Sequence, residues 1–204
     1  MLTDRKLVGG AMVILAFATA ALVVLPYLQL HRLKPPDGLK PYTEQQLRGR
    51  NVYIANGCLY CHSQQPRDPA VGPDYLRGWG RAPVPADYVF DKPHLLGTMR
   101  TGPDLFNIGA RQPSADWQLG HLYQPRAYVK GSIMPAFPFL FVVKPRLEEG
   151  EHAVSLPPQY APEHGVVVAT DEAQDLVAYL LGLNHTYPVY RDELTAHTAK
   201  REGQ

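Results

Sequence analysis

The segment Gly57-Cys58-Leu59-Tyr60-Cys61-His62 contains both cysteines of this 204-residue chain and one of its eight histidines. The pattern Cys-x-x-Cys-His is typical of covalent c-type haem attachment. Each thiol can add across a vinyl group of the porphyrin, and the histidine that follows is then placed to bind the iron from one side. We therefore expect thioether bonds at Cys58 and Cys61 and an axial ligand at His62.

Other uses of this motif fit the chain less well. A thioredoxin-like redox pair needs a βαβ setting in which the motif opens a helix, and the flanking sequence lacks that pattern. A structural zinc site would need histidines from scattered loops to complete its ligand set. A disulfide between cysteines this close in sequence would be strained and would close almost no loop.

A long apolar run precedes the motif. Leu7–Leu30 extends over 24 residues without a charged side chain. At about 1.5 Å per residue a helix of this length measures about 36 Å, enough to cross a hydrocarbon layer of roughly 30 Å. Ala18-Thr19-Ala20 has the form of a signal cleavage site, but the run is longer than the usual signal core of about 7 to 15 residues. We predict an uncleaved membrane anchor, in which Pro26 lies where a local break is tolerated.

The chain divides into four predicted parts of mainly α class, with long irregular loops. These are an anchor over 1–33, a proline-rich linker over 34–42, a haem domain over 43–190 and a polar tail over 191–204. The formal net charge of +1 and the absence of a basic run argue against nucleic acid as a partner. Basic residues flank the anchor on both sides, so they do not orient it. Because c-type haem is attached outside the cytoplasm, we expect a cytoplasmic N-terminus and a periplasmic domain on a bacterial inner membrane.

Cap and stop residues predict helices in the domain. Thr43-x-x-Gln46 has the form of a capping box before a helix that continues over 47–57, and Ser114 precedes a short helix reaching about Tyr123. Thr170 precedes an amphipathic helix that ends at Gly182. The segments 63–101 and 142–168 show neither helical nor strand periodicity, so we predict irregular loops, the second at the surface. The expected anchors of the first loop are its aromatic residues Tyr75, Trp79, Tyr88 and Phe90.

A haem iron that only transfers electrons needs a second axial ligand. Of the four methionines, Met1 starts the chain and Met12 lies in the apolar run, which leaves Met99 and Met134. Pro135 restricts Met134 to an extended conformation, so Met134 lies on a held loop and is the expected ligand. Met99, or a histidine such as His94 or His121, remains an alternative.

Further residues are candidates for the haem surroundings. A ligating histidine usually donates its second ring N–H to an acceptor that orients it. Pro103 offers a carbonyl without a competing N–H, so its backbone is the candidate acceptor. Arg111 and Arg126 are candidate partners of the haem propionates, because a guanidinium matches a carboxylate, although both also suit a solvated surface.

Together these residues resemble the monohaem cytochrome c subunit, subunit II, of cbb3-type cytochrome c oxidases. The resemblance rests on the anchor and on several stretches in the family's order. These are Gly49-Arg50-Asn51-Val52-Tyr53-Ile54, Cys58 to Gln64, Arg100-Thr101-Gly102-Pro103-Asp104-Leu105, Asp116-Trp117, His121-Leu122, Pro125-Arg126 and Met134-Pro135-Ala136-Phe137-Pro138.

The resemblance implies a class I cytochrome c fold whose first and last helices cross near the haem. Gly49 and Tyr53 on the first helix and Tyr179 on the last would meet there, with His62 and Met134 as the axial ligands. Within the matching stretches, Tyr53, Leu105 and Trp117 are expected in the haem pocket.

The resemblance also implies the biological role. One covalent haem c would pass electrons to a haem-copper catalytic subunit that reduces oxygen. A dihaem cytochrome c subunit would lie upstream and membrane lipid around the anchor, and the chain would have no catalytic site of its own. The cytochrome subunit of a nitric oxide reductase and a free-standing anchored electron shuttle remain alternative functions.

Overall fold

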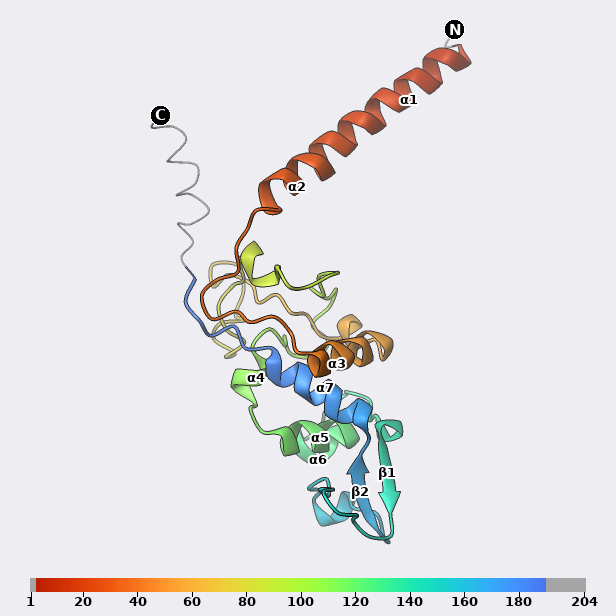
Figure 1. The fold of residues 1–204 in the computed structure, drawn as a ribbon, viewed down its shortest axis with the longest axis vertical. Helices are drawn as coiled ribbons and strands as arrows, with labels where there is room; N and C mark the ends of the chain where they lie inside the picture. Colours follow the sequence, from red (N-terminus) through yellow and green to blue (C-terminus); the bar gives the residue numbers. More distant parts are fainter. Residues whose placement is uncertain (1–2, 190–204) are drawn as a thin grey trace.

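The computed structural model describes residues 3–189 as a mostly helical chain with one small sheet. In Figure 1, α1 and α2 project from one end of the domain, α3 and α7 lie in its middle, and the two-stranded β1–β2 sheet lies at the other end. The elements are α1 Asp4–Thr19, η1 Ala20–Val24, α2 Leu25–Leu30, α3 Glu44–Ala55, η2 Cys58–Tyr60, η3 Pro85–Tyr88, α4 Ile108–Arg111, α5 Ala115–Tyr123, α6 Pro125–Tyr128, η4 Pro138–Leu140, β1 Phe141–Lys144, η5 Pro158–Tyr160, β2 Val166–Ala169 and α7 Asp171–Gly182. The prediction of a mainly α fold is confirmed, and the predicted tail over 191–204 lies outside the described residues.

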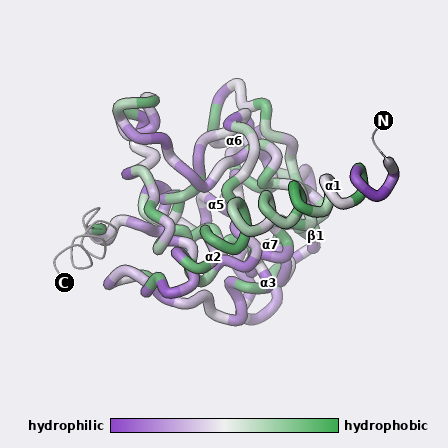
Figure 2. Tube along the Cα trace, turned by 90° about the horizontal axis from the view of Figure 1, so that it is seen from above, coloured by the Kyte–Doolittle hydropathy of each residue, from purple (hydrophilic) through white to green (hydrophobic). Residues whose placement is uncertain are grey.

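The N-terminal elements α1, η1 and α2 form a continuous helix, Asp4–Leu30, with a mean hydropathy of 2.5 in its most apolar window. Figure 2 shows hydrophobic colouring over most of this helix. Its π-helical turn Ala20–Val24 ends two residues before Pro26. Proline lacks an N–H and its ring clashes with the carbonyl one turn earlier, and a widened turn relieves that clash. The helix is long and apolar enough to be a candidate membrane span.

Side-chain caps begin the three helices predicted in the domain. The Gln46 backbone N–H donates to Thr43 Oγ1 (3.2 Å), and the Thr43 N–H donates to Gln46 Oε1 (2.9 Å), which completes the capping box of α3. Ser114 caps α5 and Thr170 caps α7 in the same way, each through its hydroxyl oxygen. These helices are confirmed, although α3 begins at Glu44 and ends at Ala55, before the turn at Gly57.

Thr43→Ala is expected to destabilise the domain by about 1 kcal/mol, because the mutation removes the acceptor for an N–H of the first turn. For a chain of this size the midpoint of thermal unfolding should fall by about 2 to 4 °C. The measurement is helical circular dichroism of the full-length protein in detergent. Thr98→Ala, at an exposed position, is the control and should leave the midpoint unchanged. Equal midpoints for the two variants would contradict the role of the cap.

The helices α3 and α7 cross with their backbones in close contact. A Cβ added at Gly49 would lie 1.8 Å from the backbone oxygen of Asp175, so only glycine allows this approach. One turn further on, the rings of Tyr53 and Tyr179 meet edge to face at 5.5 Å. Arg48 adds paired hydrogen bonds of 2.7 and 3.0 Å to the Asp175 carboxylate. The crossing implied by the family resemblance is therefore present.

The segment 63–101 is irregular apart from η3, as predicted. Trp79 and Tyr88 are buried, at 9% and 8% exposure, but Tyr75 is 58% exposed, so its prediction as an anchor is wrong. The loop is held instead by carboxylates whose side chains are inaccessible to solvent. Asp87 pairs with Arg81 at 2.8 Å, and Asp74 pairs with Arg67 at 2.6 Å. The sequence did not predict these ion pairs, because oppositely charged residues so close in the chain usually pair at the solvent-exposed surface.

The prediction that 142–168 is wholly irregular surface is wrong at both ends of that segment. β1 and β2 pair antiparallel, from Phe141 opposite Ala169 to Lys144 opposite Val166. Val167 and Val168 are 2% and 4% exposed, and the Val154 N–H donates to the Val167 carbonyl at 2.8 Å. The valine run of β2 is β-branched, which favours a strand once an apolar surface is available to cover it.

Candidate functional site

The Cys-x-x-Cys-His turn lies directly after α3. Gly57, with φ of 67°, ends the helix in the left-handed conformation and leads into η2. Both thiols are free; Cys58 is partly buried against the hydrophobic core, and Cys61 is exposed. Burial raises the pKa of the Cys58 thiol to about 11. The turn therefore presents one thiol at the core and the other at the surface.

His62 is held by the carbonyl predicted from the sequence. Its Nδ1 lies 2.7 Å from the Pro103 oxygen, and because that oxygen can only accept, Nδ1 carries the proton. Nε2 is then the nitrogen left to bind a metal. Burial lowers the pKa of His62, which favours the neutral ring that a metal needs. A Cβ at Gly102 would lie 2.2 Å from His62 Cε1, so the backbone approaches the ring face as only glycine permits.

Met134 lies in the irregular segment between α6 and η4, as the following proline predicted. Its side chain is partly buried and packs against the same hydrophobic core as Cys58. The Phe137 N–H donates to the Leu122 carbonyl at 3.0 Å, which joins this segment to α5. Of the alternative ligands, Met99 is 59% exposed and His94 is exposed. The structure thus packs Met134, and not Met99, against the core that Cys58 also contacts.

The other predicted pocket residues fall into two groups. Tyr53 and Leu105 belong to the buried core, at 1% and 8% exposure. Trp117 is partly buried on α5 and stacks on His121, with ring centroids 4.6 Å apart. Arg126 is exposed on α6 and makes no hydrogen bond or ion pair within residues 3–189, so the structure does not bring it to the others.

Two buried polar atoms near His62 lack a partner among the described residues. Arg111 Nη2 donates to the Asp104 carbonyl at 3.0 Å, whereas Arg111 Nη1 is buried and unpaired, as is His121 Nδ1. Burial lowers the pKa of Arg111, and burial with the charge of His62 lowers the pKa of His121 to about 4. A buried polar atom without a partner is unfavourable unless a further group bonds to it. A haem propionate could accept from Arg111 Nη1, so this atom and the Cys, His and Met set fit a c-type haem.

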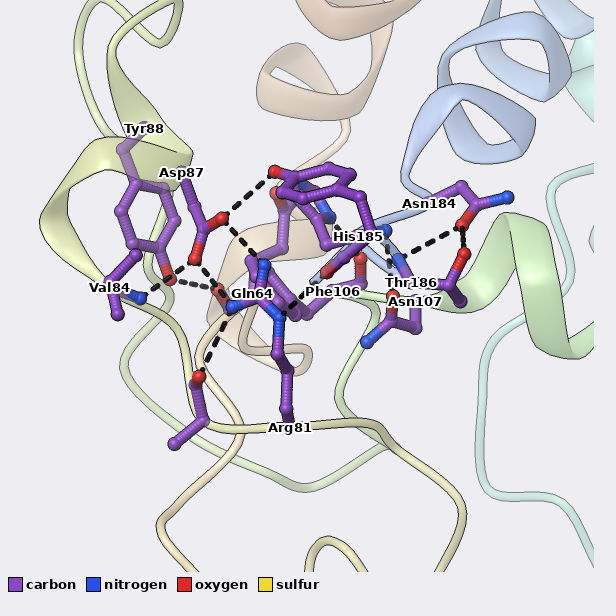
Figure 3. A network of polar contacts seen from close by, with 12 residues as sticks. Gln64, Arg81, Val84, Asp87, Tyr88, Phe106, Asn107, Asn184, His185 and Thr186 are labelled. Carbon is purple, nitrogen blue, oxygen red and sulfur yellow. Dashed lines mark hydrogen bonds and ion pairs between the residues drawn. The ribbon is translucent and has the colours of Figure 1, made fainter. Parts of the chain in front are cut away.

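A polar network holds the chain that follows the haem motif (Figure 3). Tyr88 Oη donates to the Gln64 carbonyl at 2.7 Å, and Gln64 Nε2 donates to Tyr179 Oη at 3.1 Å. Beyond α7, the buried His185 stacks on Phe106 with ring centroids 3.9 Å apart. Gln64, two residues after His62, is thereby joined to Tyr88 further along the same loop and to Tyr179 of α7. No local pattern predicted this network, because its members are dispersed along the chain and follow no motif.

An N-terminal candidate membrane span and a helical domain with crossing helices around a single Cys-x-x-Cys-His turn define an anchored cytochrome c-like protein. The model of the family described as cytochrome c oxidase, mono-heme subunit/FixO, matches residues 3–176, and the chain belongs to this family. These proteins are the monohaem electron-transfer subunits of cbb3-type oxidases, which confirms the resemblance. No curated protein matches the chain.

Proposed function

We propose that this chain passes electrons through one covalently bound haem c to the haem-copper catalytic subunit of a cbb3-type oxidase. The observation that carries the proposal is the geometry of His62, whose Nδ1 is already bonded to Pro103 while Nε2 stays available. The family match over residues 3–176 supports the same role. When bound, the haem supplies reversible one-electron chemistry at its iron.

The residues of the chain would hold the haem from several sides. Cys58 and Cys61 would form the thioether bonds, and His62 and Met134 would ligate the iron. With both ligands bound, the site would exclude small-molecule ligands and would transfer electrons only. A thioether ligand raises the reduction potential, because it favours the reduced iron. Arg111 would donate to a propionate, while Tyr53, Leu105 and Trp117 would keep water from the haem surface.

The anchor would keep this domain beside its partners. We place the N-terminus in the cytoplasm and the domain in the periplasm of a bacterial inner membrane, with a dihaem cytochrome c subunit as electron donor and lipid around Asp4–Leu30. The linker packs onto the domain: a Cβ at Gly38 would lie 2.9 Å from Cβ of Tyr187. Tyr187 Oη in turn donates to Asp87 at 2.9 Å. This packing of the linker against the domain supports a position of the domain close to the membrane surface.

Purification of the full-length protein from membranes in mild detergent tests this function. We expect co-purification with a haem-copper subunit, a low-spin c-type spectrum and reduction of oxygen by the complex. Reduction of nitric oxide without oxygen reduction would assign the chain to the alternative reductase. Recovery of the intact haem protein without any haem-copper subunit would instead indicate a free-standing shuttle. A sample handled identically but prepared from cells lacking this chain is the control.

A further inference from the structure

We propose that Asp104 is a positioning residue which, through Ser63, holds His62 against Pro103 and so sets the reduction potential of the haem. The inference rests on the proposed function in one respect, since it takes His62 as an axial ligand. Asp104 itself would touch neither the haem nor its iron.

The Asp104 carboxylate is fully buried, and both of its oxygens accept hydrogen bonds. It accepts hydrogen bonds from Ser63 Oγ at 2.5 Å, from the Gln65 N–H at 2.8 Å and from the Phe106 N–H at 2.8 Å. Its exposure is 0%. Burying a carboxylate is unfavourable unless its oxygens are bonded, so a site of this kind places strong demands on the position of each donor.

Hydrogen bonds join residues 61–65, which include His62, to residues 102–106, which lie against its ring. Before His62, the Gly102 N–H donates to the Cys61 carbonyl at 2.9 Å. After it, the Leu105 N–H donates to the Ser63 carbonyl at 2.8 Å. The Asp104 side chain adds further hydrogen bonds between the same two segments. Asp104 directly follows Pro103, and its partner Ser63 directly follows His62. Within residues 3–189 it is the side chain of the 102–106 segment that bonds back to residues 63–65.

The ring has little freedom inside this enclosure. A Cβ at Gly97 would lie 2.5 Å from the His62 carbonyl oxygen, and one at Gly102 would lie 2.2 Å from His62 Cε1. Backbone therefore contacts His62 both behind its main chain and against its ring. A small shift of the 102–106 segment must change the 2.7 Å contact between His62 Nδ1 and the Pro103 oxygen.

That contact controls the electron density that the imidazole gives to the iron. Donation of Nδ1–H to a carbonyl raises the basicity of the ring and stabilises the oxidised iron. Hydrogen bonds to an axial ligand are among the means by which proteins tune haem potentials. Loosening the contact should therefore raise the reduction potential.

The test compares Asp104→Asn, Ser63→Ala and Asp74→Asn in the full-length holoprotein. We expect a positive shift of potential in Asp104→Asn and Ser63→Ala, with displaced paramagnetic NMR signals of the His62 ring and retention of the near-infrared band of the methionine–iron bond. Ser63→Ala leaves the charge unaltered, so its shift reports position and not electrostatics. Asp74 is as buried as Asp104 but bonds to Arg67, and its variant should leave the potential and the His62 signals unchanged.

The results separate this inference from the proposed function. Unchanged potential and His62 signals in Ser63→Ala would overturn the inference, and so would an equal shift in Asp74→Asn. If Asp104→Asn fails to fold, Ser63→Ala still decides. A wild-type protein without a low-spin c-type spectrum would contradict the proposed function itself, whereas a normal wild-type spectrum with silent variants contradicts only the role of Asp104.

Discussion

Met134→Ala is expected to lower the reduction potential of the haem by on the order of 0.1 V, since axial ligands set haem potentials over a range of about 0.8 V. The loss follows because the thioether favours the reduced iron, and alanine leaves that coordination position to water or to an added ligand. The measurements are a redox titration and the absorption spectrum of the full-length protein with and without carbon monoxide. Carbon monoxide should bind to the variant and not to the wild type.

Met99→Ala is the matched control, because Met99 is 59% exposed on the long loop. It should leave the potential and the spectrum at their wild-type values. A wild-type spectrum in Met134→Ala would remove Met134 as ligand. In that case, the same measurements on Met99, His94 and His121 variants would identify the ligand among the alternatives.

Gly49→Ala is expected to destabilise the domain by about 3 kcal/mol, at the upper end of the range of about 1 to 3 kcal/mol for overpacking. The new methyl group would lie 1.8 Å from the Asp175 backbone oxygen, and neither backbone can yield without separating α3 from α7. Thermal unfolding of the full-length holoprotein should shift downward by about 6 to 12 °C. Helical circular dichroism and the haem absorption should report the same transition if the crossing and the haem site unfold together.

Gly182→Ala provides the comparison on the opposite helix. A Cβ there would meet the Gln46 side-chain amide at 2.5 Å, and that side chain can move aside at the cost of its hydrogen bond with the Thr43 N–H. Its unfolding free energy should stay within about 1 kcal/mol of the wild type, because alanine also favours the helix. If Gly49→Ala were no more harmful than Gly182→Ala, close backbone contact would not be what limits this crossing.

Local chemistry accounts for the features predicted correctly. The capping box of α3 joins residues three apart, and the hydroxyl caps of α5 and α7 also act within one turn. The long apolar helix can be predicted from composition alone, because its backbone groups bond within the helix itself. The bond between His62 and Pro103 is the exception, since it joins residues 41 apart. It was predicted because a ligating histidine needs an acceptor and because Pro103 offers a carbonyl without a competing N–H.

In α3, tertiary packing and not the spacing of apolar residues decides which face of the helix is buried. Its apolar residues Leu47 and Ile54 are 46% and 36% exposed, whereas the buried face carries Gly49, Arg50 and Tyr53. Arg50 can be buried because its guanidinium lies 3.3 Å from Asp91, far away along the chain. No periodicity of apolar residues describes such a face, since its partners are a backbone carbonyl, a tyrosine ring and a distant carboxylate.

The order of residues alone determined the Cys-x-x-Cys-His motif, the candidate membrane span and the helix starts, since each depends on neighbours within a turn or on composition. The tertiary structure decided which methionine reaches the core, which face of α3 is buried, that residues 141–169 contain paired strands, and that Asp104 joins the segments around His62. Those outcomes depend on contacts between residues distant in the chain. Such contacts form only when burial of apolar surface brings the distant residues together, and local sequence patterns do not predict which residues will meet.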